Sequence, residues 1–212
     1  AGEIVGIAGL EGSGKAALAR AIFGDRPFTR GAVRFLGEPV DLRHPRAGIS
    51  AGIGYLSDDR KREGCLIQQS LRDNLLLVRR ASAGAARGAN AGSLADVEAD
   101  EMMRRLDVRA ADFGQAIGAL SGGNQQKVIL GRWLARDPRL LIFCEPTRGI
   151  DVAAKAAIYR LMRDVAARGR GVVMVSSDLP EVIGVSDRIL VMHQGRIAGE
   201  CSPDVVSLIH IS

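Results

Sequence analysis

The sequence has few cysteines, few aromatic residues and no long apolar run, and each shortage narrows the class of protein. No apolar stretch approaches the roughly 18 residues that a membrane-spanning helix needs, so the sequence predicts no such helix. The three cysteines are widely spaced, which matches neither a disulfide framework nor a zinc site. We therefore expect a chain that works in a reducing cytosol.

The shortage of aromatic residues bears on the basic charge of the chain. A formal net charge of +5 and a pI near 9.6 permit a nucleic-acid partner. Aromatic residues make up only 4% of the chain, however, and no aromatic stripe accompanies the scattered arginines. We therefore favour a solvated basic surface and expect no nucleic-acid partner.

Length and composition are those of one globular domain. The 212 residues suffice for one well-buried domain, and 47% of them are apolar and 25% charged. The chain begins with Ala1-Gly2-Glu3, without an initiator Met, and we expect no secretory leader. We expect it to be a piece of a longer protein, with a frayed end over residues 207–212.

Short apolar runs alternate with helical patterns along the chain. The runs predict strands at residues 4–8, 32–36, 140–143, 172–175 and 188–192, with turns at 37–39 and 195–196. Helical patterns cover residues 15–23, 94–106, 124–136 and 152–167. The stretch from about 60 to 137 is helical throughout, apart from an Ala/Gly/Ser-rich connection at 81–92 that we expect to be flexible. This order predicts an α/β fold with a mostly parallel sheet flanked by helices, interrupted by a helical subdomain.

Residues 9–15, Gly-Leu-Glu-Gly-Ser-Gly-Lys, have the pattern of a phosphate-binding loop between a strand and a helix. Gly12 and Gly14 allow backbone N–H groups to point toward an anion, and the helix dipole favours the same charge. Lys15 supplies a positive charge for the outer phosphates. The alternative is a glycine-rich turn with an accidental lysine, which the strand, the spacing and the helix argue against.

A second phosphate-binding pattern lies at residues 120–127, Leu-Ser-Gly-Gly-Asn-Gln-Gln-Lys. A hydroxyl and exposed amides at a helix N-terminus can contact phosphate. Taken alone, Ser-Gly-Gly before a helix is also compatible with an ordinary N-terminal cap. Two such surfaces in one small domain suggest a nucleotide that is gripped from two sides.

These motifs, with the strand that ends at Glu145 and the Gly149-Ile150-Asp151 turn, resemble the ATP-binding domains of ABC transporters. The resemblance covers almost the whole chain in the correct order. More narrowly, residues 54–64, 145–152 and 176–181 are similar to the second, C-terminal ABC domain in the ATPase subunit of bacterial monosaccharide (ribose/xylose/galactose-type) importers. The resemblance implies the ABC ATPase fold. Its P-loop NTPase core would comprise residues 1–58 and 138–212, and its helical signature subdomain residues 59–137.

The resemblance also implies roles for individual residues. Nucleotide binding falls on the phosphate loop and the start of its helix, namely Gly9, Glu11, Gly12, Ser13, Gly14, Lys15, Ala16 and Ala17. The signature residues, which contact the nucleotide of a partner domain, are Leu120, Ser121, Gly122, Gly123 and Gln125. Glu145 matches the catalytic glutamate that polarises the attacking water. Asp58, Asp151 and Ser177 match, in turn, the glutamine-loop position, the domain seam and the histidine that contacts the outer phosphate.

Two residues depart from this pattern at the magnesium position. Ala16 stands where a Ser or Thr hydroxyl is usual, and Cys144 stands where an Asp is usual. Magnesium prefers near-octahedral oxygen ligands, which alanine lacks and a soft thiol supplies poorly. Together with Ser177 in place of the histidine, these changes predict hydrolysis slower by on the order of a thousandfold or more. The loop and Lys15 do not depend on the metal, so ATP is expected to bind although the Mg²⁺ site is incomplete.

The leading hypothesis is a nucleotide-binding domain of a bacterial sugar ABC importer, with a degenerate site that completes the site of its partner. Its expected partners are a sibling ABC domain in a head-to-tail pair, membrane permease subunits and, indirectly, a periplasmic sugar-binding protein. Its expected place is the cytoplasmic face of the inner membrane. Two alternatives stay open. One is a slow but active Mg-ATPase of the same transporter class, and the other is a soluble ABC protein that acts on nucleic acid.

Overall fold

The computed structural model describes residues 2–27, 30–82 and 91–205, which fall into two compact units. The first unit comprises residues 1–58, 138–146 and 159–212, and the second comprises residues 59–137 and 147–158. Both bury large apolar side chains, among them Phe143 in the first unit and Leu75 in the second. The predicted flexible connection at 81–92 and the predicted frayed end lie mostly outside the described residues.

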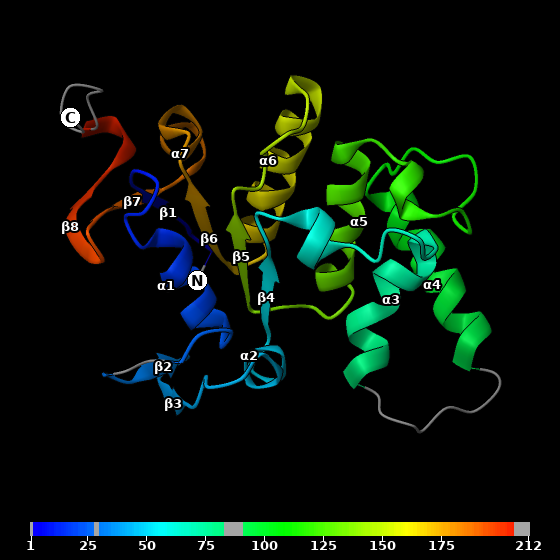
Figure 1. Ribbon diagram of the computed structural model, residues 1–212, viewed down its shortest axis with the longest axis horizontal. Coiled ribbons are helices and arrows are strands. Elements are labelled where there is room, and N and C mark those ends of the chain that lie inside the picture. The colour runs from blue at the N-terminus through cyan, green and yellow to red at the C-terminus, as the bar shows by residue number, and fades with distance from the viewer. Residues whose placement is uncertain (1, 28–29, 83–90, 206–212) are drawn as a thin grey trace. The chain divides into compact units, whose positions relative to one another are not determined.

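A six-stranded sheet forms the centre of the first unit. Its strand order is β4-β5-β6-β1-β7-β8, and every neighbouring pair is parallel except β7 and β8 (Figure 1). The strands are β1 (Ile4–Ala8), β4 (Ile53–Leu56), β5 (Leu140–Cys144), β6 (Gly171–Ser176), β7 (Arg188–His193) and β8 (Arg196–Cys201), and β2 (Val33–Phe35) and β3 (Glu38–Val40) form a separate hairpin. The mostly parallel sheet predicted from the sequence is confirmed.

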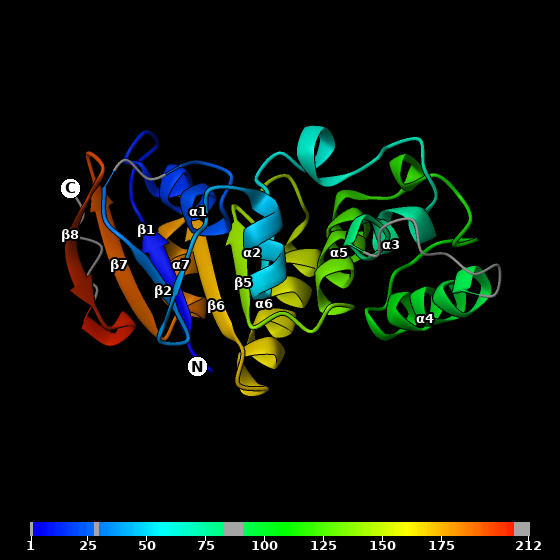
Figure 2. The ribbon, with the colours of Figure 1, turned by 90° about the horizontal axis from the view of Figure 1, so that it is seen from below.

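Helices cover both faces of this sheet. The first unit holds α1 (Lys15–Phe23), α2 (Pro45–Ala51), α7 (Leu179–Val185) and the short η3 (Pro203–Val205). Figure 2 shows α1 and α2 on one side of the strands and α7 on the other. On the α7 face, Val182 packs against Ala8 and Ile189 in a buried cluster. Gly6 in β1 permits this approach, because a Cβ there would lie 2.2 Å from Ser186 Oγ.

Two hairpin turns start one residue earlier than the sequence predicted. Leu36 and Gly37, with φ angles of 54° and 88°, join β2 to β3. Gln194 and Gly195, with φ angles of 47° and 77°, join β7 to β8. Two-residue hairpins of this kind need positive φ at both central positions. The predicted turn at 195–196 was wrong by one position, and the predicted turn at 37–39 began one residue late and included the first two residues of β3. Both errors arise because leucine and glutamine rarely adopt that conformation.

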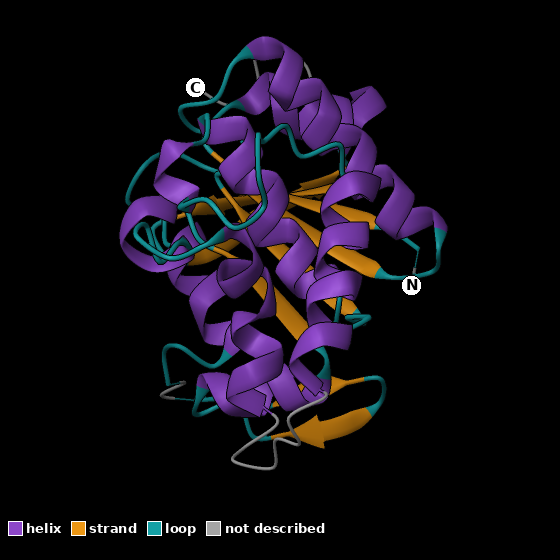
Figure 3. Ribbon diagram, turned by 90° about the vertical axis from the view of Figure 1, so that its right-hand side faces the viewer, coloured by secondary structure: helices purple, strands orange, loops and turns teal. Residues whose placement is uncertain are grey.

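Helices and loops make up the second unit (Figure 3). Its elements are η1 (Arg60–Gly64), α3 (Leu71–Ser82), α4 (Ala91–Arg105), η2 (Ile117–Ala119), α5 (Gly122–Leu134) and the first turns of α6 (Val152–Ala167). The predicted bounds of α6 are confirmed. Helix α5 starts two residues earlier than predicted, because Ser121 is its N-cap. In the described part of the chain, no helix combines the length and apolar character that crossing a membrane requires.

A buried polar network joins α3 to α5 within the second unit. Arg132 Nε donates to the carbonyl oxygen of Asn74 at 2.7 Å. The Asn74 side chain accepts from Leu66 N at 2.8 Å and donates to the carbonyl oxygens of Leu66 and Gln69. Burial lowers the pKa of the Arg132 guanidinium to about 10. The network therefore fixes the loop before α3 onto both helices, at the cost of burying a positive charge.

Candidate functional site

The loop between β1 and α1 has the backbone of an anion cradle. Gly12 and Gly14 have φ angles of 82° and 97°, a conformation that side chains rarely tolerate. Gly9 is required for space as well, because a Cβ there would lie 2.6 Å from the carbonyl oxygen of Met192. Gly14 is the N-cap of α1, and no side chain of the described residues caps it there. The N–H groups of the first turn can therefore receive an anion, which the helix dipole also favours.

The other residues of the loop differ in exposure. Glu11 and Ala17 are exposed, whereas Ser13 is buried. The backbone of Ser13 is tied down, since its N–H donates to Leu10 O at 3.1 Å and its carbonyl accepts from Gly195 N at 2.8 Å. Its Oγ is buried and has no hydrogen-bond partner among the described residues. A buried hydroxyl in this state costs free energy that a ligand oxygen at the loop would recover.

Lys15 brings its charge to the mouth of the loop and is 6% exposed. Its Nζ donates to Ser177 Oγ at 2.9 Å and to Leu10 O at 3.4 Å. The Glu145 carboxylate lies 3.8 Å from the same nitrogen. A buried ammonium needs such partners, and a bound phosphate would compete with Glu145 for it. The structure therefore brings together three residues that the sequence placed in different motifs.

Glu145 follows the last residue of β5 in an unusual backbone conformation. Its φ angle is 47°, which is uncommon for a residue with a side chain, and its N–H donates to Val175 O at 2.7 Å. The carboxylate accepts from Ser177 Oγ at 2.7 Å and contacts Ser176 Oγ at 3.5 Å. Backbone strain of this kind persists where the surroundings fix the residue, as they do at many functional sites.

The two residues that the sequence predicts at the magnesium position, Ala16 and Cys144, offer no oxygen donor from their side chains. Ala16 carries no oxygen, and Cys144 is fully buried at the end of β5. Burial, with the Asp58 charge as a smaller cause, raises the pKa of the Cys144 thiol to about 11. The described residues contain no group of three His, Cys, Asp or Glu side chains that could hold a metal ion. A neutral thiol and a methyl group do not fit Mg²⁺, which prefers oxygen ligands.

Asp58 lies two residues beyond the end of β4 and close to α1. Its Oδ1 is 3.8 Å from Arg20 Nη2 and 3.4 Å from Ser57 Oγ. Arg20 also donates to Asp25 at 2.7 Å, so its guanidinium bridges two carboxylates. The Arg20 guanidinium lies 5.9 Å from the centre of the Tyr55 ring. Asp58 is thus already matched by a positive charge, which reduces what it can offer to a cation.

The signature residues form the N-terminus of α5 in the second unit. Ser121 is exposed and caps the helix, with its Oγ accepting from Asn124 Nδ2 at 3.0 Å and Asn124 N at 3.5 Å. Gln125 is buried and donates from Nε2 to Leu120 O at 3.2 Å. Residues 122–123 make the first turn of the helix. A hydroxyl and backbone amides therefore meet at one helix end, as an anion-binding surface requires.

Asp151 lies at the start of α6 and has a local structural role. Its Oδ1 accepts from Ala154 N at 2.9 Å, and its carbonyl accepts from Lys155 N at 3.0 Å. Both bonds are those of an N-cap residue. Asp151 is also exposed, so its second carboxylate oxygen can reach a partner without loss of the cap.

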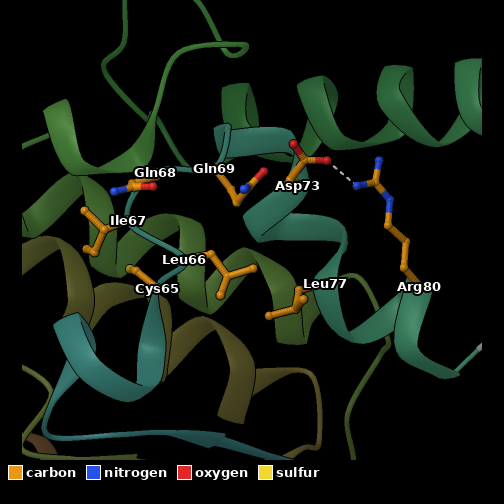
Figure 4. Close-up of a pocket in the computed structure, with 8 residues that line it drawn as sticks. All are labelled: Cys65, Leu66, Ile67, Gln68, Gln69, Asp73, Leu77 and Arg80. Carbon is orange, nitrogen blue, oxygen red and sulfur yellow. Dashed lines mark hydrogen bonds and ion pairs between the residues drawn. The ribbon is translucent and has the colours of Figure 1, made fainter.

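The second unit also has a hollow of about 610 Å³ beside the loop that precedes α3. Leu66, Ile67 and Leu77 give it an apolar wall, and Leu66 and Ile67 are 46% and 37% exposed. Figure 4 shows the Asp73 carboxylate paired with the Arg80 guanidinium at one end. Exposed apolar side chains with a charged rim are typical of protein contact surfaces.

The family model for ABC transporters matches residues 1–148, which include the phosphate loop, the signature and Glu145. The chain belongs to the ABC transporter family. The resemblance drawn from the motifs is thereby confirmed.

Similar proteins match most of the length of this ABC domain. The ribose import ATP-binding protein RbsA 1 of Streptomyces avermitilis is 48% identical over 209 residues, which are 96% of this chain and 39% of that protein. The ribose import ATP-binding protein RbsA of Lactococcus lactis is 46% identical, over 93% of this chain and 40% of that protein. The chain thus spans about two fifths of the length of these relatives.

Solved structures agree on the fold of the domain. A dimeric ATP-binding cassette, MJ0796, bound to ADP and Pi superposes with a TM-score of 0.80. It is 22% identical, with 95% of this chain and 86% of that chain covered. A nucleotide-free cassette from an ABC transporter gives the same TM-score at 21% identity. The predicted ABC ATPase fold is confirmed.

Sequence reasoning missed several residues that shape the two sites. Tyr55 lies beside Cys144, and burial raises the pKa of its hydroxyl. Arg20 pairs with Asp58, although nothing in its local sequence points to that contact. Arg60 binds the turn before α6 across 88 residues of sequence. These pairs join residues that are far apart in the sequence, so no local pattern indicates them. Ser176, which immediately precedes Ser177, could have been found from its place at a strand end.

Proposed function

We propose that this chain is the nucleotide-binding domain of a bacterial sugar ABC importer of the ribose type. Its own site would be one of low activity, and the domain would complete the active site of a sibling domain. The importer assignment is supported by the ribose import relatives, which match over most of the chain. Residues 54–64 and 176–181 are similar to the C-terminal ABC domain of such importers. This similarity supports the view that the chain is the second of the two ABC domains in the ATPase subunit.

One observation carries the low-activity proposal. The phosphate cradle and Lys15 are intact, whereas the magnesium position holds Ala16 and a buried thiol whose pKa is about 11. Phosphoryl transfer depends on positioning and charge neutralisation, and a bound Mg²⁺ would supply part of the charge neutralisation. The main chain and Lys15 would hold the phosphates. Glu145 would orient a water, but without a well-held metal the developing charge is poorly matched.

The domain would then use its nucleotide as a clamp. Ser121, Gly122 and Gly123 would contact the nucleotide of the sibling in a head-to-tail pair, and Asp151 would lie at the seam. Asp58, in the first unit, would lie near the contact with the permease subunits. In the second unit, the apolar wall of the hollow beside the α3 loop supports a protein partner for that unit. A periplasmic sugar-binding protein would be an indirect partner. The domain would work at the cytoplasmic face of the inner membrane.

The test is steady-state ATP hydrolysis by the purified domain, alone and with Ala16→Thr and Cys144→Asp introduced together. We expect very low turnover, and an increase of roughly a hundredfold or more when both magnesium ligands are restored. Readily measured turnover without the substitutions, with only a modest gain from them, would contradict the proposal. That result would favour a slow Mg-ATPase in which Asp58, the main chain or waters hold the ion.

A soluble ABC protein acting on nucleic acid is the other candidate, and the pI near 9.6 is the observation that favours it. Binding of that kind weakens steeply with salt. We expect no retention of DNA or RNA at physiological ionic strength in a filter-binding assay. Salt-sensitive retention under those conditions would revive this candidate.

A further inference from the structure

Three segments that are far apart in the sequence meet at one residue of the second unit. Arg60, at the start of η1, donates from Nη1 to Arg148 O at 2.9 Å and from Nη2 to Gly149 O at 3.0 Å. These two carbonyls belong to the turn just before α6. The same guanidinium lies against Gly122, in the first turn of α5. One side chain thus contacts both the signature motif and the turn that carries Asp151.

The signature glycines are shaped to this contact. A Cβ on Gly122 would lie 2.4 Å from Arg60 Nη2 and 3.1 Å from Gly149 O, so the guanidinium fills the place of a side chain. A Cβ on Gly123 would lie 2.6 Å from Ala154 Cβ in the first turn of α6. Glycine is therefore needed at both positions for close packing, in addition to any contact with a ligand.

Arg60 is itself held in place from behind. Cys65 N donates to Arg60 O at 2.7 Å, which closes the turn of η1. At the far end of η1, a Cβ on Gly64 would lie 3.0 Å from Ile129 Cδ1 of α5. The turn thus rests along α5 from Gly122 to Ile129. The turn of η1 is π-helical. Such turns are rare in proteins, and those that occur are often found at functional sites.

We propose that Arg60 is a positioning residue that locks the turn at residues 147–151 to the signature motif. Asp151 and Ser121 would then face a sibling domain as one rigid surface. The proposal rests on the proposed head-to-tail pairing, which supplies the partner for that surface. A planar guanidinium can bridge two neighbouring carbonyls, which a lysine ammonium does poorly. Its Nε is buried without a hydrogen-bond partner among the described residues, so the two carbonyls set its orientation.

The first test measures hydrogen exchange in the purified chain. Arg60→Met should speed exchange of the amides at 148–151 and 122–124 by about tenfold, while α3 exchanges as in the wild type. Arg60→Lys should give a smaller increase in the same segments. Arg62→Met is the matched control, because Arg62 is exposed on the same turn, and it should leave both segments unchanged. Wild-type exchange in both segments of Arg60→Met would overturn the proposal.

A double-mutant cycle distinguishes loss of the Arg60 contact from general destabilisation of the fold. Gly122→Ala places a methyl group where the guanidinium lies, so it should also speed exchange at 148–151. In the Arg60→Met background the methyl group no longer meets the guanidinium and only approaches Gly149 O, so the same substitution should add less than it does in the wild type. Additive effects of the two substitutions would overturn the lock.

The last arm measures hydrolysis at the sibling site in the full two-domain protein. Arg60→Met should lower kcat about tenfold and leave KM for ATP unchanged, because the sibling still binds its nucleotide. A merely structural defect would instead lower the amount of folded protein at the wild-type kcat, and that result overturns positioning. Gly122→Asp serves as the check on pairing itself. If it leaves sibling hydrolysis intact, the proposed function fails, while the exchange data still decide whether the lock exists.

Discussion

Lys15 and Cys144 are both buried close to the phosphate loop, but the surroundings of Lys15 stabilise a charged side chain and those of Cys144 disfavour one. Lys15 has a hydroxyl, a carbonyl and a carboxylate around its ammonium. Cys144 is fully buried beside the Tyr55 hydroxyl, and burial, with the nearby Asp58 charge, raises the pKa of its thiol to about 11 and keeps it neutral. The site therefore offers a positive charge to a phosphate at Lys15, whereas Cys144 stays neutral and adds no negative charge for a metal ion.

Ionisation of the Cys144 thiol should lower the free energy of unfolding at alkaline pH. Its folded pKa of about 11 exceeds its usual value of 9.0, so its contribution is complete below pH 9 and is lost as pH rises toward 11. The free energy of unfolding should fall by up to about 3 kcal/mol over that range. Urea titrations at pH 8.5 and 10.5 measure the fall. Cys144→Ala should reduce it, whereas Cys201→Ala, a half-exposed control, should not. An equal fall in both variants would contradict the assignment.

Nucleotide binding should depend on Lys15 and hardly on the metal. Titration of a fluorescent ATP analogue should give a similar Kd with Mg²⁺ and with excess EDTA, because the cradle and Lys15 need no ion. Lys15→Met should weaken binding by roughly tenfold or more, through loss of a charge-assisted contact. Lys61→Met is the matched control, since Lys61 is exposed on η1. A large gain from Mg²⁺ in the wild type would show that another group holds the ion.

At the scale of elements, close helix approach depends on a glycine in α2. Gly48 has no room for a side chain, because a Cβ there would lie 2.2 Å from the carbonyl oxygen of Phe23, the last residue of α1. That obstacle is backbone and cannot rotate away. Gly184 in α7 is also helical, yet a Cβ on it would meet nothing within 4 Å. Substitution of Gly48 therefore tests the packing of two helices, whereas substitution of Gly184 tests helix propensity alone.

Substitution of these glycines should have opposite signs. Gly48→Ala should lower the free energy of unfolding by about 1–3 kcal/mol, because α1 and α2 must move apart. Gly184→Ala should raise it by about 0.5–1 kcal/mol, since alanine favours the helix and restricts the unfolded chain. Thermal and urea unfolding measure both. A Gly48→Ala variant as stable as the wild type would show that the helices repack.

The same scale shows why some elements follow from the sequence and others do not. Strand 4–8 and helix 152–167 have a clear period and clear ends, and the structure has them at those bounds. Strand β4 is only four residues long and was not predicted, because an isolated short run has no period to read. Helix α7 was missed as well. Its seven residues include Pro180, which is tolerated in a first helical turn but reads as a breaker.

At the scale of the whole molecule, the site residues come from loops that lie far apart in the chain. The sequence identified Lys15, Glu145 and Ser177 separately, by their motifs. Their proximity follows from the topology, because β1, β5 and β6 are parallel neighbours whose carboxyl ends lie at one edge. The contacts of Arg20 and Arg60 could not be foreseen, since they depend on side chains that reach across loops with no shared pattern.

Pairing with a sibling domain gives a prediction at this scale. Gly122→Asp in the full two-domain protein should abolish most hydrolysis at the sibling site, because a carboxylate would replace an anion-binding surface. The same variant should still bind a fluorescent ATP analogue at its own phosphate loop. Rates of phosphate release and a binding titration measure the two effects. Unchanged phosphate release would count against the head-to-tail arrangement.

The antiparallel strand β8 has a consequence for behaviour at high concentration. It ends the sheet and is exposed along almost all of its length, which leaves a row of backbone groups for another strand to pair with. Arg196 and Glu200 place charges on this edge, and the pairing with β7 shifts register between Val191 and Met192. Charge and irregular register both oppose docking of a second copy at the edge. Aggregation through β8 should therefore be slow, and replacing Arg196 and Glu200 together with neutral residues should increase the rate of aggregation.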